Sequence, residues 1–69
     1  MTNTELLNEA IEKSGYKRSY IAKSLGLTTF GLSNKIKNKT EFKSGEIIVL
    51  CNLLNIESLE EREAIFFAV

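Results

Sequence analysis

Residues 18–36, RSYIAKSLGLTTFGLSNKI, decide the fold of this chain. Apolar residues recur at helical spacing on both sides of Gly26, which predicts two short helices joined by a tight turn. Ala22 lies where these helices cross, and its small side chain allows them to approach closely. Gly26 is expected at positive φ, which glycine adopts without a Cβ clash. Thr28 is the predicted N-cap of the second helix, because its hydroxyl can accept a hydrogen bond from a free backbone N–H.

The spacing of these residues is that of a helix-turn-helix, which we place at about residues 18–37. Counted from Arg18, the small residue Ala22 is fifth, Gly26 is ninth and the apolar Leu32 is fifteenth, and these are the marked positions of the motif. The alternative is an ordinary corner between two helices of a small bundle. The cap, the short turn and the apolar spacing together favour the helix-turn-helix.

Length and composition describe one small globular domain over residues 1–69. The chain is 43% hydrophobic and 26% charged, and it contains no proline and a single cysteine. A chain of this size buries only about 60% of the surface that its unfolded form exposes, so a partner would add stability. We expect a cytoplasmic protein, because no leader-like or membrane-spanning apolar run is found and Cys51 has no second cysteine to pair with.

The whole sequence predicts an all-α fold of five short helices around one core. The expected helices cover about residues 3–14, 17–25 and 29–37, then the run EIIVLCNLL after Ser44 and the run LEEREAIFFAV after Ser58. Thr2, Ser44 and Ser58 are the predicted N-caps of the first, fourth and fifth helices. Asn38 is expected to end the third helix in the left-handed conformation.

The fourth and fifth helices carry most of the remaining apolar residues. The predicted buried stripe of the fourth helix consists of Ile47, Leu50, Cys51 and Leu54, widened by Ile48. Adjacent residues of a helix point about 100° apart, so at least one of Phe66 and Phe67 is expected to stay exposed.

The sequence contains few of the residue types that catalysis and metal binding require. It has no histidine, no paired aspartates and no phosphate-cradling glycine loop. Cys51 is interpreted as a small core residue, because no histidine is present to activate it as a nucleophile. We therefore expect no enzyme activity, no catalytic or metal site, no cofactor and no small-molecule ligand.

The net charge of zero conceals a strong division along the chain. Residues 13–43 hold eight basic side chains and one glutamate, a net charge of +7, and the remaining residues hold one arginine and eight glutamates, a net charge of −7. Such a division predicts two electrostatic faces, one of which could meet phosphate. The alternative is a solvated surface whose charges are divided by chance.

The candidate binding residues lie on the second helix of the motif and at its flanks. These DNA- or repressor-binding candidates are Arg18, Thr28, Thr29, Phe30, Ser33, Asn34, Lys37 and Lys39. In a helix-turn-helix, the N-terminal side chains of the second helix reach base edges in the major groove. Asn34 can bond adenine, while Arg18 and Lys39 lie where phosphate contacts are expected. Phe30 can touch a thymine methyl group or anchor a bound protein.

The segments YIAKSLGLTTFGLSNKIKNK and FKSGEIIVLCNLLNI resemble the Cro/CI-type helix-turn-helix regulators of temperate phages. The similarity extends from about Leu6 to Ile56 and implies the lambda-repressor-like DNA-binding fold. One residue departs from the pattern, because Lys35 stands where these regulators usually carry an apolar side chain. Ile36 is expected to take the inward role, pairing with Leu32 at helical spacing.

Taken as a whole, the chain is most similar to the small antirepressors, or modulators of repression, of lactococcal temperate phages. This resemblance implies a regulator of the lytic–lysogenic switch in the bacterial cytoplasm, one that binds the DNA-binding domain of the phage repressor and blocks its operator binding. The alternative is a Cro-like repressor that binds operator double-stranded DNA directly through residues 29–37. We expect no membrane partner.

Overall fold

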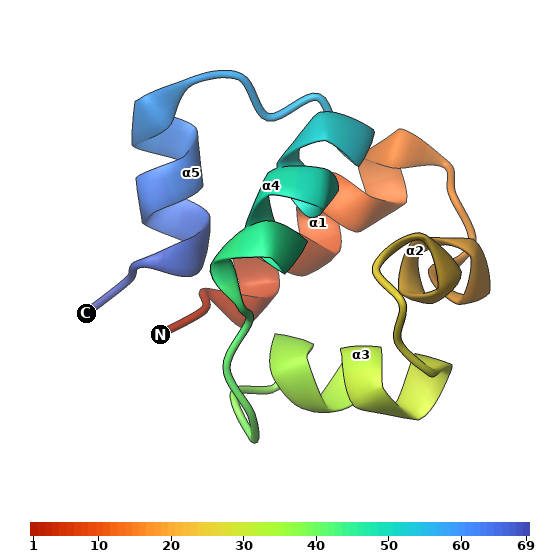
Figure 1. The fold of residues 1–69 in the computed structure, drawn as a ribbon. Helices are drawn as coiled ribbons and strands as arrows, with labels where there is room; N and C mark the ends of the chain where they lie inside the picture. The colour runs from red at the N-terminus through yellow and green to blue at the C-terminus, as the bar shows by residue number, and fades with distance from the viewer.

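Five α-helices and no strand make up the computed structural model, which describes residues 1–69 (Figure 1). The helices are α1 Thr4–Ser14, α2 Arg18–Ser24, α3 Thr29–Ile36, α4 Ser44–Leu53 and α5 Leu59–Phe66. The all-α prediction is confirmed, and the ends of the first three helices differ from the expected ones by one residue at most. None of the helices combines the length and the hydrophobicity that crossing a membrane requires.

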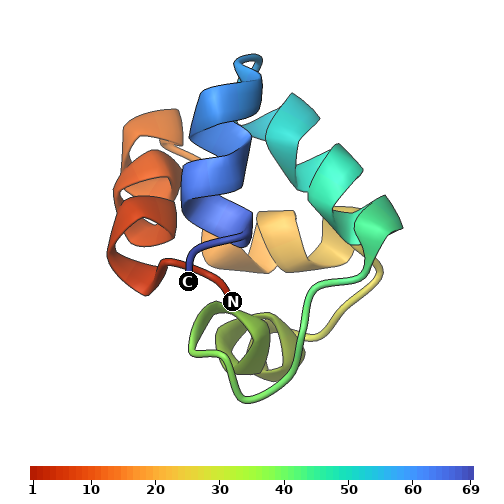
Figure 2. The same ribbon diagram turned by 90° about the vertical axis from the view of Figure 1, so that its left-hand side faces the viewer.

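The helices surround one core, to which each of them contributes. In the two views, α1, α4 and α5 lie around the upper part of the molecule, while α3 closes it from below (Figures 1 and 2). Four side chains, one from each of α1 to α4, are fully buried at the centre: Leu7, Ile21, Leu32 and Leu50. α5 adds Ile65 and Phe66, and the ring of Phe66 meets the edge of Phe42 at a centroid distance of 5.6 Å.

The turn between α2 and α3 has the predicted local chemistry. Ala22 is only 1% exposed, and its carbonyl oxygen accepts a hydrogen bond of 2.8 Å from Leu27 N–H across the turn. Gly26 has φ +73°, so the prediction of a left-handed glycine is confirmed. The Thr28 hydroxyl accepts from Gly31 N–H at 2.9 Å, which confirms Thr28 as the N-cap of α3. Asn38 follows α3 at φ +65°, also as predicted.

Two of the three other predicted N-caps are wrong, and the third is right. Asn3, not Thr2, caps α1, because its side-chain oxygen accepts from Leu6 N–H at 3.1 Å. Lys43, not Ser44, is the capping position of α4, where the Glu46 carboxylate accepts from Lys43 N–H at 2.8 Å. Ser58 caps α5 as predicted, its hydroxyl accepting from Glu61 N–H at 3.0 Å.

Thr2 has another role, because its backbone is bound to the end of α3. The Asn38 side chain accepts from Thr2 N–H and donates to the Thr2 carbonyl oxygen, both at 2.8 Å. Beyond this pair, Asn3 N–H donates to Ile65 O at 2.6 Å, so the first residues lie between α3 and α5. The chain ends therefore lie side by side, as both ribbon views show (Figures 1 and 2).

The predicted apolar stripe of α4 is correct for its centre and wrong for its edge. Ile47, Leu50 and Cys51 are buried and Leu54 is partly buried against the core. Ile48 is 55% exposed, in an open pocket beside Leu59 and Arg62 of α5. On α5, Phe66 is buried and the adjacent Phe67 is 56% exposed, as the helical geometry predicts.

Candidate recognition surface

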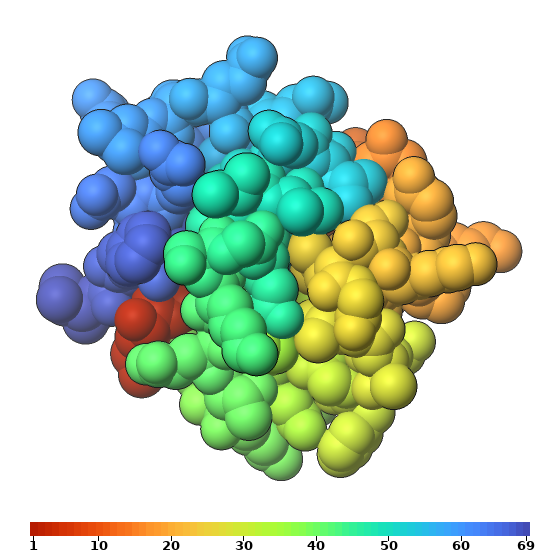
Figure 3. Space-filling view, in the orientation of Figure 1, coloured from red at the N-terminus to blue at the C-terminus, as the bar shows by residue number.

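The outer face of α3 is open to solvent, most of all at its first two residues, Thr29 and Phe30. Leu32, Lys35 and Ile36 point inward and are buried, so helical geometry turns the opposite face of α3 to solvent. Phe30 is 76% exposed on this face. In the space-filling view, α3 and the segment that follows it together form the lower edge of the molecule (Figure 3).

Polar residues surround Phe30 on the same helix. Thr29 is exposed, while Ser33 and Asn34 are partly exposed. Thr28 is exposed as well, but its oxygen already accepts from Gly31 N–H as the helix cap. Its hydroxyl can therefore contact a ligand mainly as a hydrogen-bond donor. An aromatic ring within a polar rim can therefore meet a ligand without any change in the fold.

A groove between α1 and α3 adjoins this face, and we refer to it as the α1–α3 groove. It has a volume of about 340 Å³ and is lined by Thr4, Asn8, Arg18, Thr29, Leu32, Ser33, Ile36 and Lys37. Four of the predicted binding residues meet there: Arg18, Thr29, Ser33 and Lys37. The buried Leu32 and Ile36 supply its apolar lining, and no carboxylate lines it.

Helix α1 contributes two residues to the groove that sequence reasoning missed. Asn8 accepts a hydrogen bond of 3.0 Å through its side-chain oxygen from Arg18 Nη2. The Thr4 hydroxyl donates to the carbonyl oxygen of Ile36 at 2.6 Å and ties the start of α1 to the end of α3. Their only sequence signal is a pair of polar residues one helical turn apart, beside the buried positions of α1.

The other predicted residues lie outside the groove. Phe30 and Asn34 are on the outer face of α3, and Thr28 precedes that helix. Lys39 is exposed in the turn after α3, where its N–H donates to the carbonyl oxygen of Asn34 at 2.8 Å. The structure thus separates the eight candidates into one groove and one adjoining helix face.

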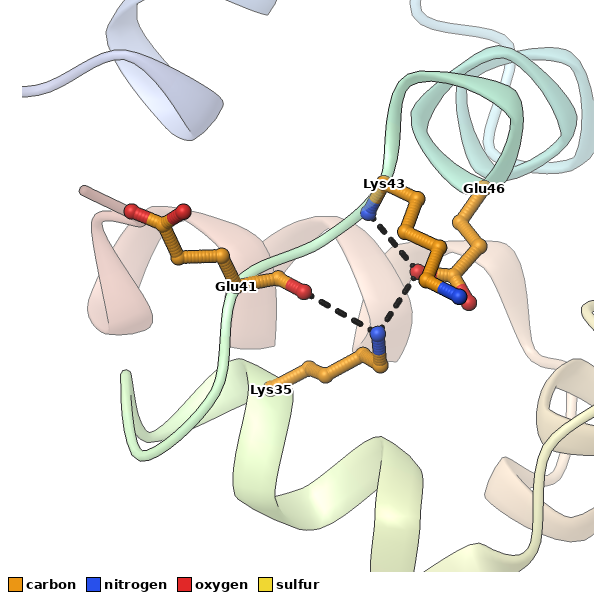
Figure 4. A network of polar contacts seen from close by, with 4 residues as sticks. All are labelled: Lys35, Glu41, Lys43 and Glu46. Atoms are coloured by element: carbon orange, nitrogen blue, oxygen red, sulfur yellow. Dashed lines mark hydrogen bonds and ion pairs between the residues drawn. The ribbon is translucent and has the colours of Figure 1, made fainter.

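Lys35 does not belong to the exposed basic side chains that the sequence predicts for residues 13–43. It is only 9% exposed, and its ammonium group donates to Glu46 Oε1 at 2.8 Å and to the carbonyl oxygen of Glu41 at 3.0 Å (Figure 4). The expected inward role of Ile36 is confirmed, and Lys35 lies beside it on the same side of α3. Lys35 and Glu46 neutralise each other, so neither belongs to the charged faces, and seven exposed cations remain in residues 13–43.

The environment of Glu46 keeps this ion pair charged. Burial alone would raise the pKa of the carboxyl group, but the Lys35 ammonium, the Lys43 backbone N–H and the two lysine charges outweigh it and hold the pKa below its ordinary value. Lys35 therefore remains bound to Glu46 near neutral pH and is not free to meet a phosphate group.

Four of the glutamates lie at the other end of the molecule, while Glu5, Glu9 and Glu12 lie on α1. Glu57, Glu60, Glu61 and Glu63 are exposed at the start of α5, which both ribbon views place far from α3 (Figures 1 and 2). This cluster beside α5 is separate from the cations of α2 and α3, whereas α1 carries three glutamates together with Lys13, so the predicted division into two faces is only partial.

The single cysteine of the chain lies in the core. Cys51 is buried, and this burial raises the pKa of its thiol, so the sulfur stays protonated near neutral pH. No cluster of three or more cysteine or glutamate side chains is placed to hold a metal ion. Comparison of the chain with models of protein families, with curated proteins and with solved structures found no match.

Proposed function

We propose that this chain is an antirepressor of the phage lytic–lysogenic switch, which binds the DNA-binding domain of the cognate phage repressor and blocks operator binding. The observation that carries the proposal is Phe30, 76% exposed on the outer face of α3 and flanked by Thr29, Ser33 and Asn34. A large aromatic side chain within a polar rim is the usual anatomy of a binding hot spot. The resemblance to the lactococcal antirepressors supports the same function.

The mechanism is competition for one surface of the repressor. A repressor's DNA-reading surface must be free to enter the major groove. If Phe30 inserts into an apolar depression of that surface, the same repressor molecule cannot hold its operator. The operator is then released by mass action, in proportion to the concentration of this chain above its dissociation constant.

Direct binding to operator DNA is the second candidate function. Its specific support is the set of seven exposed cations in residues 13–43. Asn34 adds to it, because it is partly exposed on the outer face of α3, one helical turn from Phe30. Asn34 could bond adenine, and the cations could contact phosphate. This function predicts an affinity for duplex DNA that falls steeply with salt, by a slope of about −0.9 for each phosphate contacted.

A gel-shift experiment separates the two functions. Labelled operator DNA is mixed with the repressor alone, with this chain alone, and with both. Antirepressor action predicts that rising amounts of this chain return the repressor-bound DNA to the free position, while the chain alone causes no shift. A salt-sensitive shift by the chain alone, with the repressor–operator complex left intact, would support direct DNA binding instead.

A further inference from the structure

The α1–α3 groove is built to receive a negatively charged group. Two cations, Arg18 and Lys37, line it, and no carboxylate does. The only ion pair of the structure joins Lys35 to Glu46, so the charges of Arg18 and Lys37 are not neutralised within the chain. An incoming anion would therefore meet two uncompensated positive charges.

The Arg18 side chain is held in place by a neutral partner. Its single hydrogen bond within the chain is donated by Nη2 to the side-chain oxygen of Asn8 at 3.0 Å. A guanidinium group has several further N–H donors in a planar fork, which matches the two oxygens of a carboxylate. Asn8 thus orients the fork without using its charge.

The rest of the groove lining selects among anions. Thr29 and Ser33 lie one helical turn apart and place two hydroxyl groups on the groove side of α3. Leu32 and Ile36, from the core, form an apolar surface between these polar groups. Burial of methylene groups against such a surface is favourable, whereas a bare phosphate group has no apolar part to bury. An acidic side chain, with its methylene stem and its carboxylate, fits both parts of the lining.

We propose that the α1–α3 groove binds a glutamate or aspartate side chain of the repressor through Arg18, with Asn8 as the positioning residue. The proposal rests on the proposed function and adds a second, charged contact to the one made by Phe30. Thr29 lines the groove and is the chain neighbour of Phe30, so one partner surface can reach both. The groove then selects repressors that present an acid beside the apolar depression.

Calorimetric titration into the repressor's DNA-binding domain tests this contact. Arg18→Gln should weaken binding by about tenfold or more, because a charge-assisted, two-point contact is lost. Arg62→Gln is the matched control: it makes the same chemical change on α5, outside the α1–α3 groove, and should leave the affinity within about twofold of the wild type. Both variants should keep the wild-type melting temperature.

Asn8→Ala tests positioning through a double-mutant cycle. In the wild-type background it should weaken binding, whereas in the Arg18→Gln background it should cause no further loss, because the group that Asn8 orients is gone. Additive losses would overturn the positioning role, because Asn8 would then contact the partner itself or act on the fold.

The remaining outcomes distinguish this proposal from the proposed function. If Phe30→Ala weakens binding but Arg18→Gln does not, the groove proposal is wrong and the antirepressor function stands. If Arg18→Gln weakens binding to operator duplex and leaves repressor binding unchanged, the groove holds a DNA phosphate instead. Failure of the wild-type chain to bind the repressor would overturn both proposals.

Discussion

Lys35 is a charged residue on the inner side of α3, buried beside the apolar Leu32 and Ile36. Its ammonium group is satisfied by Glu46 from α4 and by the Glu41 carbonyl oxygen from the connecting loop. The Glu46 carboxylate is satisfied in turn by Lys43 N–H (Figure 4). A buried ion pair adds little net stability compared with apolar packing, but loss of one partner is costly. The pair thus fixes how the end of α3 meets the start of α4.

The pH dependence of stability tests this pair. Glu46→Gln should lower the free energy of unfolding at neutral pH by about 1–3 kcal/mol, because Lys35 keeps its charge without a carboxylate. Since folding lowers the pKa of Glu46, its contribution is present above the ordinary pKa of 4.5 and is lost as the pH falls through the lower folded value. The wild-type and Glu46→Gln stabilities, measured by urea unfolding, should therefore converge on acidification.

Glu41→Gln is the control for this comparison. Only the backbone carbonyl of Glu41 contacts Lys35, and its carboxylate is exposed. This variant should follow the wild-type curve at every pH. A constant difference between the wild type and Glu46→Gln from neutral to acidic pH would show that the pair is not a source of stability.

At the scale of the helices, local chemistry could be predicted and long-range contacts could not. Gly26, Thr28 and Asn38 behave as predicted, because a positive φ or a capping hydroxyl depends on neighbours within a few residues. Thr2 fails as a cap because its backbone is bound to a residue 36 positions away. Ile48 stays exposed although α5 residues lie beside it, and the periodicity of α4 alone cannot predict how closely α5 packs there.

The same distinction explains the candidate site. The exposed face of α3 follows from its own apolar spacing, so Phe30 and Asn34 could be placed from the sequence. The α1–α3 groove joins residues of three helices, and Asn8 carries no motif that links it to Arg18. The burial of Lys35 depends on Glu46, which lies eleven residues further along the chain.

A matched pair of glycine substitutions tests the corner between α2 and α3. A Cβ would meet open space at both Gly26 and Gly45, but only Gly26 has positive φ. Gly26→Ala should therefore lower the free energy of unfolding by about 1–2 kcal/mol through backbone strain alone. Gly45→Ala, inside α4, should raise it by about 0.4–1 kcal/mol. Thermal unfolding of the two variants measures the difference, and equal melting temperatures would contradict the left-handed turn.

At the scale of the whole molecule, α3 and the start of α5 lie at opposite ends (Figures 1 and 2). α3 carries Phe30 beside the positively charged groove, and the start of α5 carries exposed glutamates. A basic repressor surface would attract the glutamates from a distance, which mainly raises the association rate. The lifetime of the complex is expected to depend on Phe30, since a buried anchor mostly controls dissociation.

Calorimetric titration of Phe30→Ala into the DNA-binding domain of the cognate repressor tests the antirepressor function most directly. Phe30→Ala should cost the complex about 2 kcal/mol or more, because a hot-spot anchor is removed. Its melting temperature should match the wild type, since the ring is 76% exposed. Phe67→Ala is the matched control, an equally apolar ring that is 56% exposed at the end of α5, and should bind like the wild type. Equal affinities for Phe30→Ala and the wild type, or no binding by the wild type, would contradict this function.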